Sequence, residues 1–117
     1  MNTRKFSYKQ EKRVAKQLGG RVQPNSGATP FLKGDVVSDN WLIECKTQLT
    51  SKSSMSIKKE WLEKLEEERL AMRKPNMALA FNFGPDEEIY YIVTEKIIKE
   101  LMRSQEENEW KYRETIT

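Results

Sequence analysis

The stretch that decides the fold is GDVVSDNWLIECKT, residues 34–47. Two extended runs, 34–37 and 41–47, flank the short polar turn Ser38-Asp39-Asn40, and this arrangement predicts a β-hairpin. Side chains alternate between the two faces of a strand, so the second run divides into two sets. One set is Trp41, Ile43 and Cys45, and the other is Leu42, Glu44 and Lys46. The hairpin therefore places two charged residues side by side on an otherwise apolar strand.

Upstream of the hairpin, residues 6–18 predict a helix that Gly19-Gly20 ends through a left-handed C-terminal cap. At about 100° per residue, this helix has a partly apolar face and a basic face. The first face holds Ser7, Glu11, Val14, Ala15 and Leu18, and the second holds Lys9, Lys12, Arg13 and Lys16. We therefore expect Glu11 to point inward. Residues 21–33 contain two prolines and a Ser-Gly pair, which predict a turn or loop.

Downstream of the hairpin, a Ser/Thr/Lys-rich loop at 50–56 precedes a predicted helix over residues 57–73. Ser56 is the expected N-cap, and Lys74-Pro75-Asn76 ends the helix. Apolar residues recur on one face, namely Ile57, Trp61, Leu62, Leu65 and Met72. This stripe predicts that the helix packs on a sheet.

The last third of the chain predicts two strands and a helix. Residues 77–83 are typical of a buried strand, and residues 89–93 of a further strand after a turn. Thr94 is the expected cap of a final helix, which gives way to a polar tail from about residue 104. The order helix, hairpin, helix, strand, strand, helix predicts an α/β sandwich with a central sheet.

Composition limits the chemistry that the chain can perform. With 117 residues, the chain fits one domain, and it contains no apolar run of about 18 residues that would span a bilayer. The basic N-terminus lacks a signal peptide's apolar stretch, so we expect a cytoplasmic protein. Cys45 is the single cysteine and histidine is absent, which excludes Cys/His metal sites and a histidine base. The net charge of +3 is compatible with a polyanionic partner.

Glu44 and Lys46 are costly to bury unless they are paired, bound to a metal or open to a cleft. A purely structural ion pair is one alternative. Asp35, on the preceding strand, would fold back beside Glu44 across the turn. Two neighbouring carboxylates repel each other unless a cation lies between them, and carboxylate oxygens suit Mg²⁺ or Mn²⁺. With a lysine beside the metal, this set of residues predicts hydrolysis of a phosphodiester bond.

Gly34-Asp35, eight intervening residues and then Glu44-Cys45-Lys46 resemble the signature of the PD-(D/E)XK nucleases, with Gly34 where proline often stands. The resemblance covers nearly the whole chain as one domain, residues 1–117. It implies an α/β fold with a restriction-endonuclease-like core, a central mixed β-sheet flanked by helices in the order α-β-β-β-α-β-β-α. It also implies that Asp35 and Glu44 bind the metal, that the Cys45 carbonyl adds an oxygen, and that Lys46 is the catalytic lysine.

Three further residues resemble parts of the active site in Holliday-junction resolvases and related phage endonucleases. Glu11 matches a first-helix glutamate that completes the acidic metal site, and Ser26 matches a small hydroxyl-bearing loop before the aspartate. Gln48 matches a polar residue near the metal or phosphate. The alternatives are a partly exposed helix charge for Glu11, a simple turn for Ser26 and a solvent-facing strand end for Gln48.

Basic residues form the expected nucleic-acid-binding surface, which would supply salt-dependent affinity without reading sequence. They are Lys9, Lys12, Arg13, Lys16, Lys33, Lys52, Lys58 and Lys59. A solvated charged face is the alternative for each. No base-reading motif is visible in the sequence, so structure-selective or non-specific cutting is favoured.

These observations predict a Mg²⁺- or Mn²⁺-dependent DNA endonuclease that acts on Holliday junctions or other branched DNA. Its compactness favours a phage or mobile element as its origin, and the host cytoplasm as its location. A homodimer is expected because one active site cuts one strand, with Trp61, Trp110 and the tail as interface candidates. The alternatives are a catalytically silent nucleic-acid-binding domain of the same fold and an adaptor with an accidental acidic cluster.

Overall fold

The predicted hairpin forms the middle of a five-stranded sheet in the computed structural model, which describes residues 3–23 and 36–116. Strand β2 (Val36–Val37) runs antiparallel to β3 (Trp41–Lys46), with Val36 opposite Ile43 and Val37 opposite Leu42. The Ser38 N–H donates a hydrogen bond of 3.0 Å to the Trp41 carbonyl and closes the turn. The hairpin prediction is therefore confirmed for the described residues; Gly34 and Asp35 lie outside them.

The other strands extend the sheet on both sides of the hairpin in the order β1-β2-β3-β4-β5. Strand β4 (Asn76–Phe81) runs parallel to β3, and β5 (Tyr90–Ile92) is antiparallel to β4. Strand β1 (Arg21–Val22) pairs with β2 at the other edge. The expectation of a loop over residues 21–33 is therefore wrong at its start, where two residues already belong to the sheet. The fold class, an α/β protein with a central mixed sheet, is confirmed.

Helix α1 (Thr3–Leu18) begins three residues before the predicted start and ends at the predicted glycines. Gly19 has a φ of 70°, and the Gly20 N–H donates to the Ala15 carbonyl at 2.9 Å, which is the left-handed cap expected from the sequence. A Cβ at Gly20 would lie 2.8 Å from the Val37 carbonyl oxygen. Glycine is therefore needed where the chain turns from α1 into the sheet edge.

Helix α2 (Lys59–Ala71) connects β3 to β4 and allows these two strands to run in parallel. It starts later than predicted, with Lys58 rather than Ser56 at the N-cap position and no side-chain cap. It ends as predicted before Pro75, through Arg73 at a φ of 56°. Its basic and acidic side chains pair near that end, where Arg69 donates hydrogen bonds to both carboxylate oxygens of Glu66.

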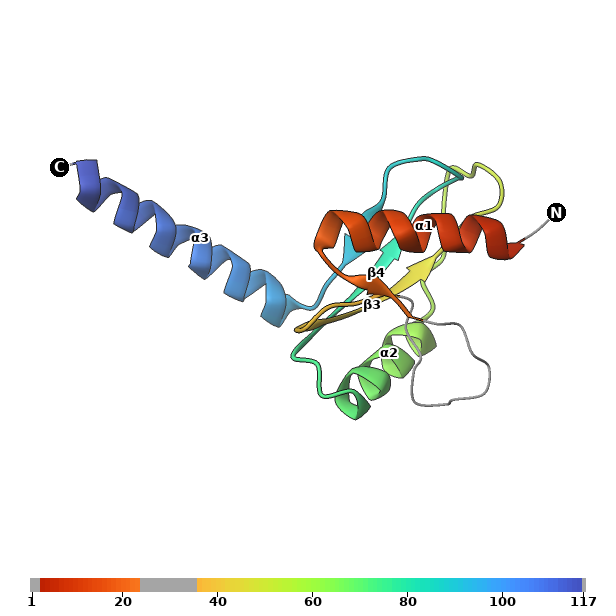
Figure 1. The fold of residues 1–117 in the computed structure, drawn as a ribbon, viewed down its shortest axis with the longest axis horizontal. Helices are drawn as coiled ribbons and strands as arrows, with labels where there is room; N and C mark the ends of the chain where they lie inside the picture. The colour runs from red at the N-terminus through yellow and green to blue at the C-terminus, as the bar shows by residue number, and fades with distance from the viewer. Residues whose placement is uncertain (1–2, 24–35, 117) are drawn as a thin grey trace.

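Helix α3 (Glu95–Ile116) begins where it was predicted to begin, because the Thr94 hydroxyl accepts a hydrogen bond from the Ile97 N–H at 3.4 Å. The expected polar tail from residue 104 is wrong, since the helix continues through it. Figure 1 shows α3 projecting away from the rest of the molecule, whose principal extents are 59 × 33 × 26 Å. Within residues 95–115, only Ile97 is buried.

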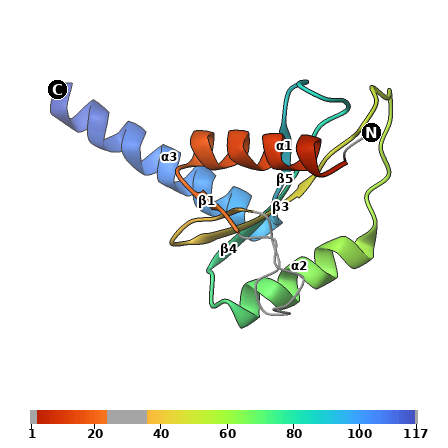
Figure 2. The same cartoon turned by 45° about the vertical axis from the view of Figure 1, so that its right-hand side comes forward.

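The core has two layers, one on each face of the sheet, because α1 and α2 cover opposite faces (Figures 1 and 2). The layer under α1 contains Val14, Ala15, Val36, Ile43, Cys45, Ala78 and Ala80. The layer under α2 contains Val37, Leu42, Leu65, Met77 and Leu79. Neither of the helices packed on the sheet, nor α3, combines the length and apolar character needed to cross a lipid bilayer, within the described part of the chain.

Candidate functional site

Glu44 and Lys46 lie at the end of β3, on the face of the sheet that α2 covers. The alternation predicted from the sequence is confirmed, because Ile43 and Cys45 pack under α1 whereas Leu42 packs under α2. The Lys46 Nζ is 3.5 Å from the Glu44 Oε1. Both side chains are about one-quarter exposed, with 28% for Lys46 and 24% for Glu44. The pair is therefore sheltered by the fold but open to a ligand.

Trp61 holds the ammonium group of Lys46 from the side of α2. The Lys46 Nζ lies 4.4 Å from the centroid of the Trp61 ring, and the Lys58 Nζ lies 5.9 Å from the same centroid. Both distances are within the range of a cation–π interaction. Trp61 also packs against the apolar layer under α2, so its position is fixed by the core. The ring thereby limits the positions that Lys46 can take near Glu44.

Gln10 of α1 forms hydrogen bonds with the end of β3 from the opposite side of the sheet. Its side chain is only 4% exposed, and its Nε2 donates to the Lys46 carbonyl at 3.1 Å. The Thr47 hydroxyl donates to the Gln10 Oε1 at 2.6 Å. Gln10 is not among the residues expected from the sequence, although its spacing of four residues from the fully buried Val14 places both on one helix face. The inward residue of this turn is Gln10, whereas Glu11 is half-buried.

Three aromatic side chains form a cluster next to Lys46 that sequence analysis also missed. Phe81 is the register partner of Lys46 in β4 and of Tyr90 in β5, so these residues share the face of the sheet that carries Lys46. The ring centroids of Phe81, Phe83 and Tyr90 are 5.7 to 5.9 Å apart. Tyr90 is 46% exposed. Aromatic rings and a cationic group therefore lie beside the Glu44 carboxylate.

Of the other residues predicted for the active site, Gln48 lies within the described part of the chain, whereas Asp35 and Ser26 do not. Gln48 lies past the end of β3 and is half-buried, so the expectation that it shares a strand face with Lys46 is wrong. Within residues 3–23 and 36–116, no three His, Cys, Asp or Glu side chains lie close enough together to hold a metal ion. The metal site expected from the sequence includes Asp35.

The basic residues predicted to bind nucleic acid divide between the two sides of the sheet. Four belong to α1: Lys9, Lys12, Arg13 and Lys16. Lys58 and Lys59 lie at the start of α2, near Trp61, and Lys52 lies in the preceding loop, where its N–H donates to the Phe83 carbonyl at 2.7 Å. Lys33 lies outside the described residues. Among these cations, Lys58 reaches the Trp61 ring beside Lys46, and the Lys52 backbone joins the segment that carries Phe83.

Comparison of the chain with protein-family models, with curated proteins and with solved structures gives no match.

Proposed function

We propose that the chain is a Mg²⁺- or Mn²⁺-dependent DNA endonuclease with a restriction-endonuclease-like core, in which Asp35, Glu44 and Lys46 form the centre of the active site. The observation that carries this proposal is the pair of Glu44 and Lys46. The two side chains are partly sheltered, interact at 3.5 Å and share a face with cations and aromatic rings. A purely structural ion pair on an apolar strand would not need further cations and aromatic rings around it.

The register of the hairpin supports a contribution from the residue that precedes β2. Val36 is opposite Ile43, and the two strands run antiparallel, so Glu44 is the next position of β3 toward the start of β2. We therefore propose Asp35, the residue before β2, as the partner of Glu44 in the site.

Glu44 fits a divalent ion because its carboxylate offers hard oxygen ligands and is partly exposed. With Asp35 and the Cys45 carbonyl as the further ligands that the resemblance implies, it would hold the ion at the end of β3. Glu11, the other ligand that the resemblance implies, belongs to α1, which covers the opposite face of the sheet from Glu44. A bound Mg²⁺ or Mn²⁺ supplies a Lewis acid for the scissile phosphate and an activated water. Lys46, steadied by Trp61, would donate hydrogen bonds to a phosphate oxygen and offset its growing negative charge.

The substrate that suits these surroundings is DNA with unpaired or distorted bases. Tyr90 lies two strands from Lys46 on the same face of the sheet and is 46% exposed, and bases stack on aromatic rings whatever their sequence. Lys52, Lys58 and Lys59 would bind the backbone phosphates nearby. This combination favours a branched or locally single-stranded substrate, such as a four-way junction, over a fully paired duplex. Two copies of the chain would provide the two cuts that junction resolution requires.

The experiment is a cleavage assay with labelled four-way-junction, linear duplex and single-stranded DNA, in the presence of Mg²⁺, Mn²⁺ or EDTA. Asp35→Asn and Lys46→Ala test the active site, and Lys64→Ala, an exposed lysine of α2, is the matched control. We expect cleavage that requires metal, is lost in the first two variants and is retained in the control. DNA binding without cleavage under every metal condition would contradict the nuclease and favour a catalytically silent DNA-binding domain.

A further inference from the structure

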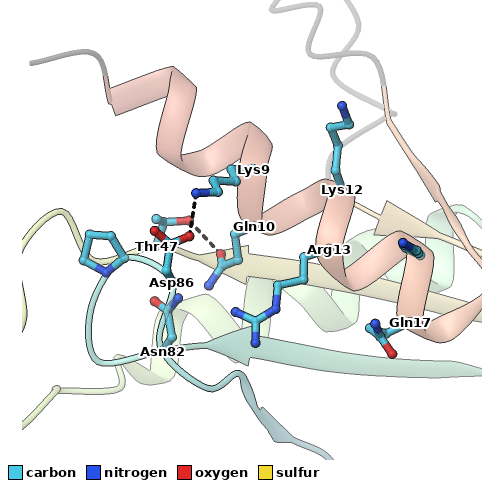
Figure 3. A pocket seen from close by; sticks show the side chains of 10 residues that line it. Lys9, Gln10, Lys12, Arg13, Gln17, Thr47, Asn82 and Asp86 are labelled. Atoms are coloured by element: carbon cyan, nitrogen blue, oxygen red, sulfur yellow. Dashed lines mark hydrogen bonds and ion pairs between the residues drawn. The ribbon is translucent and has the colours of Figure 1, made fainter.

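A pocket of about 480 Å³ lies on the side of the sheet that carries α1, between that helix and the turn from β4 to β5 (Figure 3). This volume is within the range of roughly 300–1,000 Å³ found for small-molecule sites. The walls differ in chemistry: α1 contributes amines and a guanidinium, whereas the turn contributes the Asn82 amide and the Asp86 carboxylate. Glu44 and Lys46 face α2 instead, so this pocket is separate from the proposed cleavage site.

Asn82 gives the pocket an acceptor that needs a partner. Its side chain is 3% exposed, and its Oδ1 is buried with no hydrogen-bond partner in the described part of the chain. Buried polar atoms in folded proteins are nearly always paired, because desolvation without a hydrogen bond is costly. Figure 3 shows the ends of Asn82 and Gln10 and the Arg13 guanidinium directed toward one another. A ligand with an N–H donor would satisfy the Asn82 oxygen.

The α1 wall of the pocket carries several positive charges in two helical turns. Lys9, Lys12, Arg13 and Lys16 all line it. The Lys9 Nζ is 2.6 Å from the Asp86 carboxylate, and the Arg13 Nη1 donates to the Glu87 carbonyl at 2.9 Å. The second contact uses one of the five N–H donors of the guanidinium and holds it at the pocket. This concentration of charge suits a phosphate, which has several acceptor oxygens, better than a single carboxylate.

We propose that this pocket binds a single nucleotide unit, with its phosphate at Arg13 and Lys16 and an N–H of its base at the Asn82 Oδ1. A nucleotide is the chemical class that carries an anionic phosphate at one end and ring or exocyclic N–H donors at the other. The unit has two sources, a free nucleotide or an unpaired nucleotide within a DNA strand, and both present the same chemistry to the pocket.

The test is isothermal titration calorimetry of the full-length chain in EDTA, so that the result does not depend on metal-dependent cleavage. The probes are deoxyadenosine monophosphate, deoxyribose 5-phosphate and inorganic phosphate. We expect the first to bind at least about tenfold more tightly than the second, the size of one good hydrogen bond with its partner otherwise unpaired. Asn82→Leu is expected to abolish that difference, and Arg13→Gln to weaken both organic phosphates. Lys64→Gln, remote on α2, is expected to change neither.

Equal affinities for the two organic phosphates would overturn the proposal, as would nucleotide binding that is unchanged in both Asn82→Leu and Arg13→Gln. Arg13→Gln keeps the test decisive if Asn82→Leu does not fold, because Arg13 is exposed on the helix surface. A short oligodeoxyadenylate separates the sources. Binding as tight as that of the mononucleotide, or tighter, supports the site and assigns it to a DNA strand. Binding of the mononucleotide alone supports the site and assigns it to a free nucleotide.

Discussion

Gln10 connects α1 to the end of β3 through two hydrogen bonds, one to the Lys46 carbonyl and one from the Thr47 hydroxyl. Because Gln10 is buried, the loss of either partner leaves one of its polar atoms without a hydrogen bond, since water cannot take the partner's place. The contact therefore matters for stability and for the backbone position of Lys46. A strand end that moved would move the proposed catalytic lysine with it.

We predict that Thr47→Val lowers the free energy of unfolding by roughly 1–3 kcal/mol, because it leaves the Gln10 Oε1 without its donor. In a chain that already carries Gln10→Leu, the same substitution is expected to cost much less. Urea unfolding of the two single variants and the double variant, followed by circular dichroism, measures this coupling. Additive losses in the double variant would show that the hydrogen bond does not form.

At the scale of residues, alternation along β3 was enough to predict that Glu44 and Lys46 share a face. The inward residue of α1 was harder to predict, since Gln10 and Glu11 differ by only one step of 100° on the helix. The sequence favours Glu11 because Leu18 lies on its face, but Leu18 is 48% exposed and Gln10 is buried instead. A helix that crosses a sheet buries the residues under its contact line, and this line depends on tertiary packing.

At the scale of elements, the end of α2 is stabilised by a local ion pair. Arg69 binds both oxygens of Glu66 and also donates to the Lys74 carbonyl at 3.0 Å, in the turn that leads into β4. Hydrogen bonds from Arg69 are the main cause that lowers the pKa of Glu66 below its ordinary value of 4.5. The charged carboxylate is therefore favoured more in the folded state than in the unfolded state.

We predict that the contribution of this pair to stability is present above about pH 4.5 and is lost as the pH falls through the lowered pKa of Glu66. Below that range both states are protonated at Glu66, and the folded state no longer gains from the charge. Denaturant unfolding at several pH values measures the effect. Glu66→Gln should be less sensitive to acid than the native chain, whereas Glu63→Gln, an exposed control in the same helix, should follow the native curve. Parallel curves for all three proteins would contradict the assignment.

The outer part of α3 has few contacts with the rest of the fold, since Leu101, Met102, Trp110 and Tyr112 are all more than half exposed. We predict that deletion of residues 104–117 lowers the helical signal in circular dichroism but leaves the denaturation midpoint nearly unchanged. Ile97→Ala, by contrast, should cost roughly 2–5 kcal/mol because Ile97 is buried. A large loss of stability on deletion would show that the projecting helix packs against the fold in solution.

The length of α3 and the position of β1 were not predicted correctly from the residue pattern. Residues 104–116 lack a strong apolar stripe, so they read as a tail, yet they are rich in Glu, Lys and Arg, which favour a helix without any tertiary contact. Strand β1 has only two residues, and two residues are too few for an alternating pattern to be recognised. The two longest strands, β3 and β4, carry apolar runs and were predicted to within two residues at each end.

At the scale of the whole molecule, the sheet separates two polar surfaces with different compositions. The α2 side combines Glu44 and Lys46 with the aromatic cluster of Phe81, Phe83 and Tyr90. The α1 side combines helix cations with the Asn82 pocket. The mixed sheet could be predicted from the order of elements in the sequence. The aromatic cluster could not, since it depends on the register that brings Lys46, Phe81 and Tyr90 into one row.

We predict that Tyr90→Ala weakens binding to DNA with unpaired bases at least about fivefold and leaves binding to a fully paired duplex nearly unchanged. The reason is that stacking of one base on an aromatic ring contributes roughly 1–3 kcal/mol, and bases in a duplex are already stacked. Fluorescence anisotropy in EDTA, with a labelled single-stranded oligonucleotide and a labelled duplex, measures both affinities. Tyr112→Ala, an exposed tyrosine of α3, is the control. An equal loss for both DNA forms would exclude stacking as the role of Tyr90.

The single parallel pairing among the described strands, β3 with β4, also has a consequence for how fast the chain folds. The β2–β3 hairpin and the β4–β5 pair each join strands through short connections, so they can form early and independently. The pairing of β3 with β4 must wait until the whole segment between them, including α2, has become ordered, which adds the entropy of closing a longer loop. We therefore expect formation of the β3–β4 pairing to limit the refolding rate. Substitutions in α2 should then slow folding more than substitutions in the β2–β3 hairpin or the β4–β5 pair.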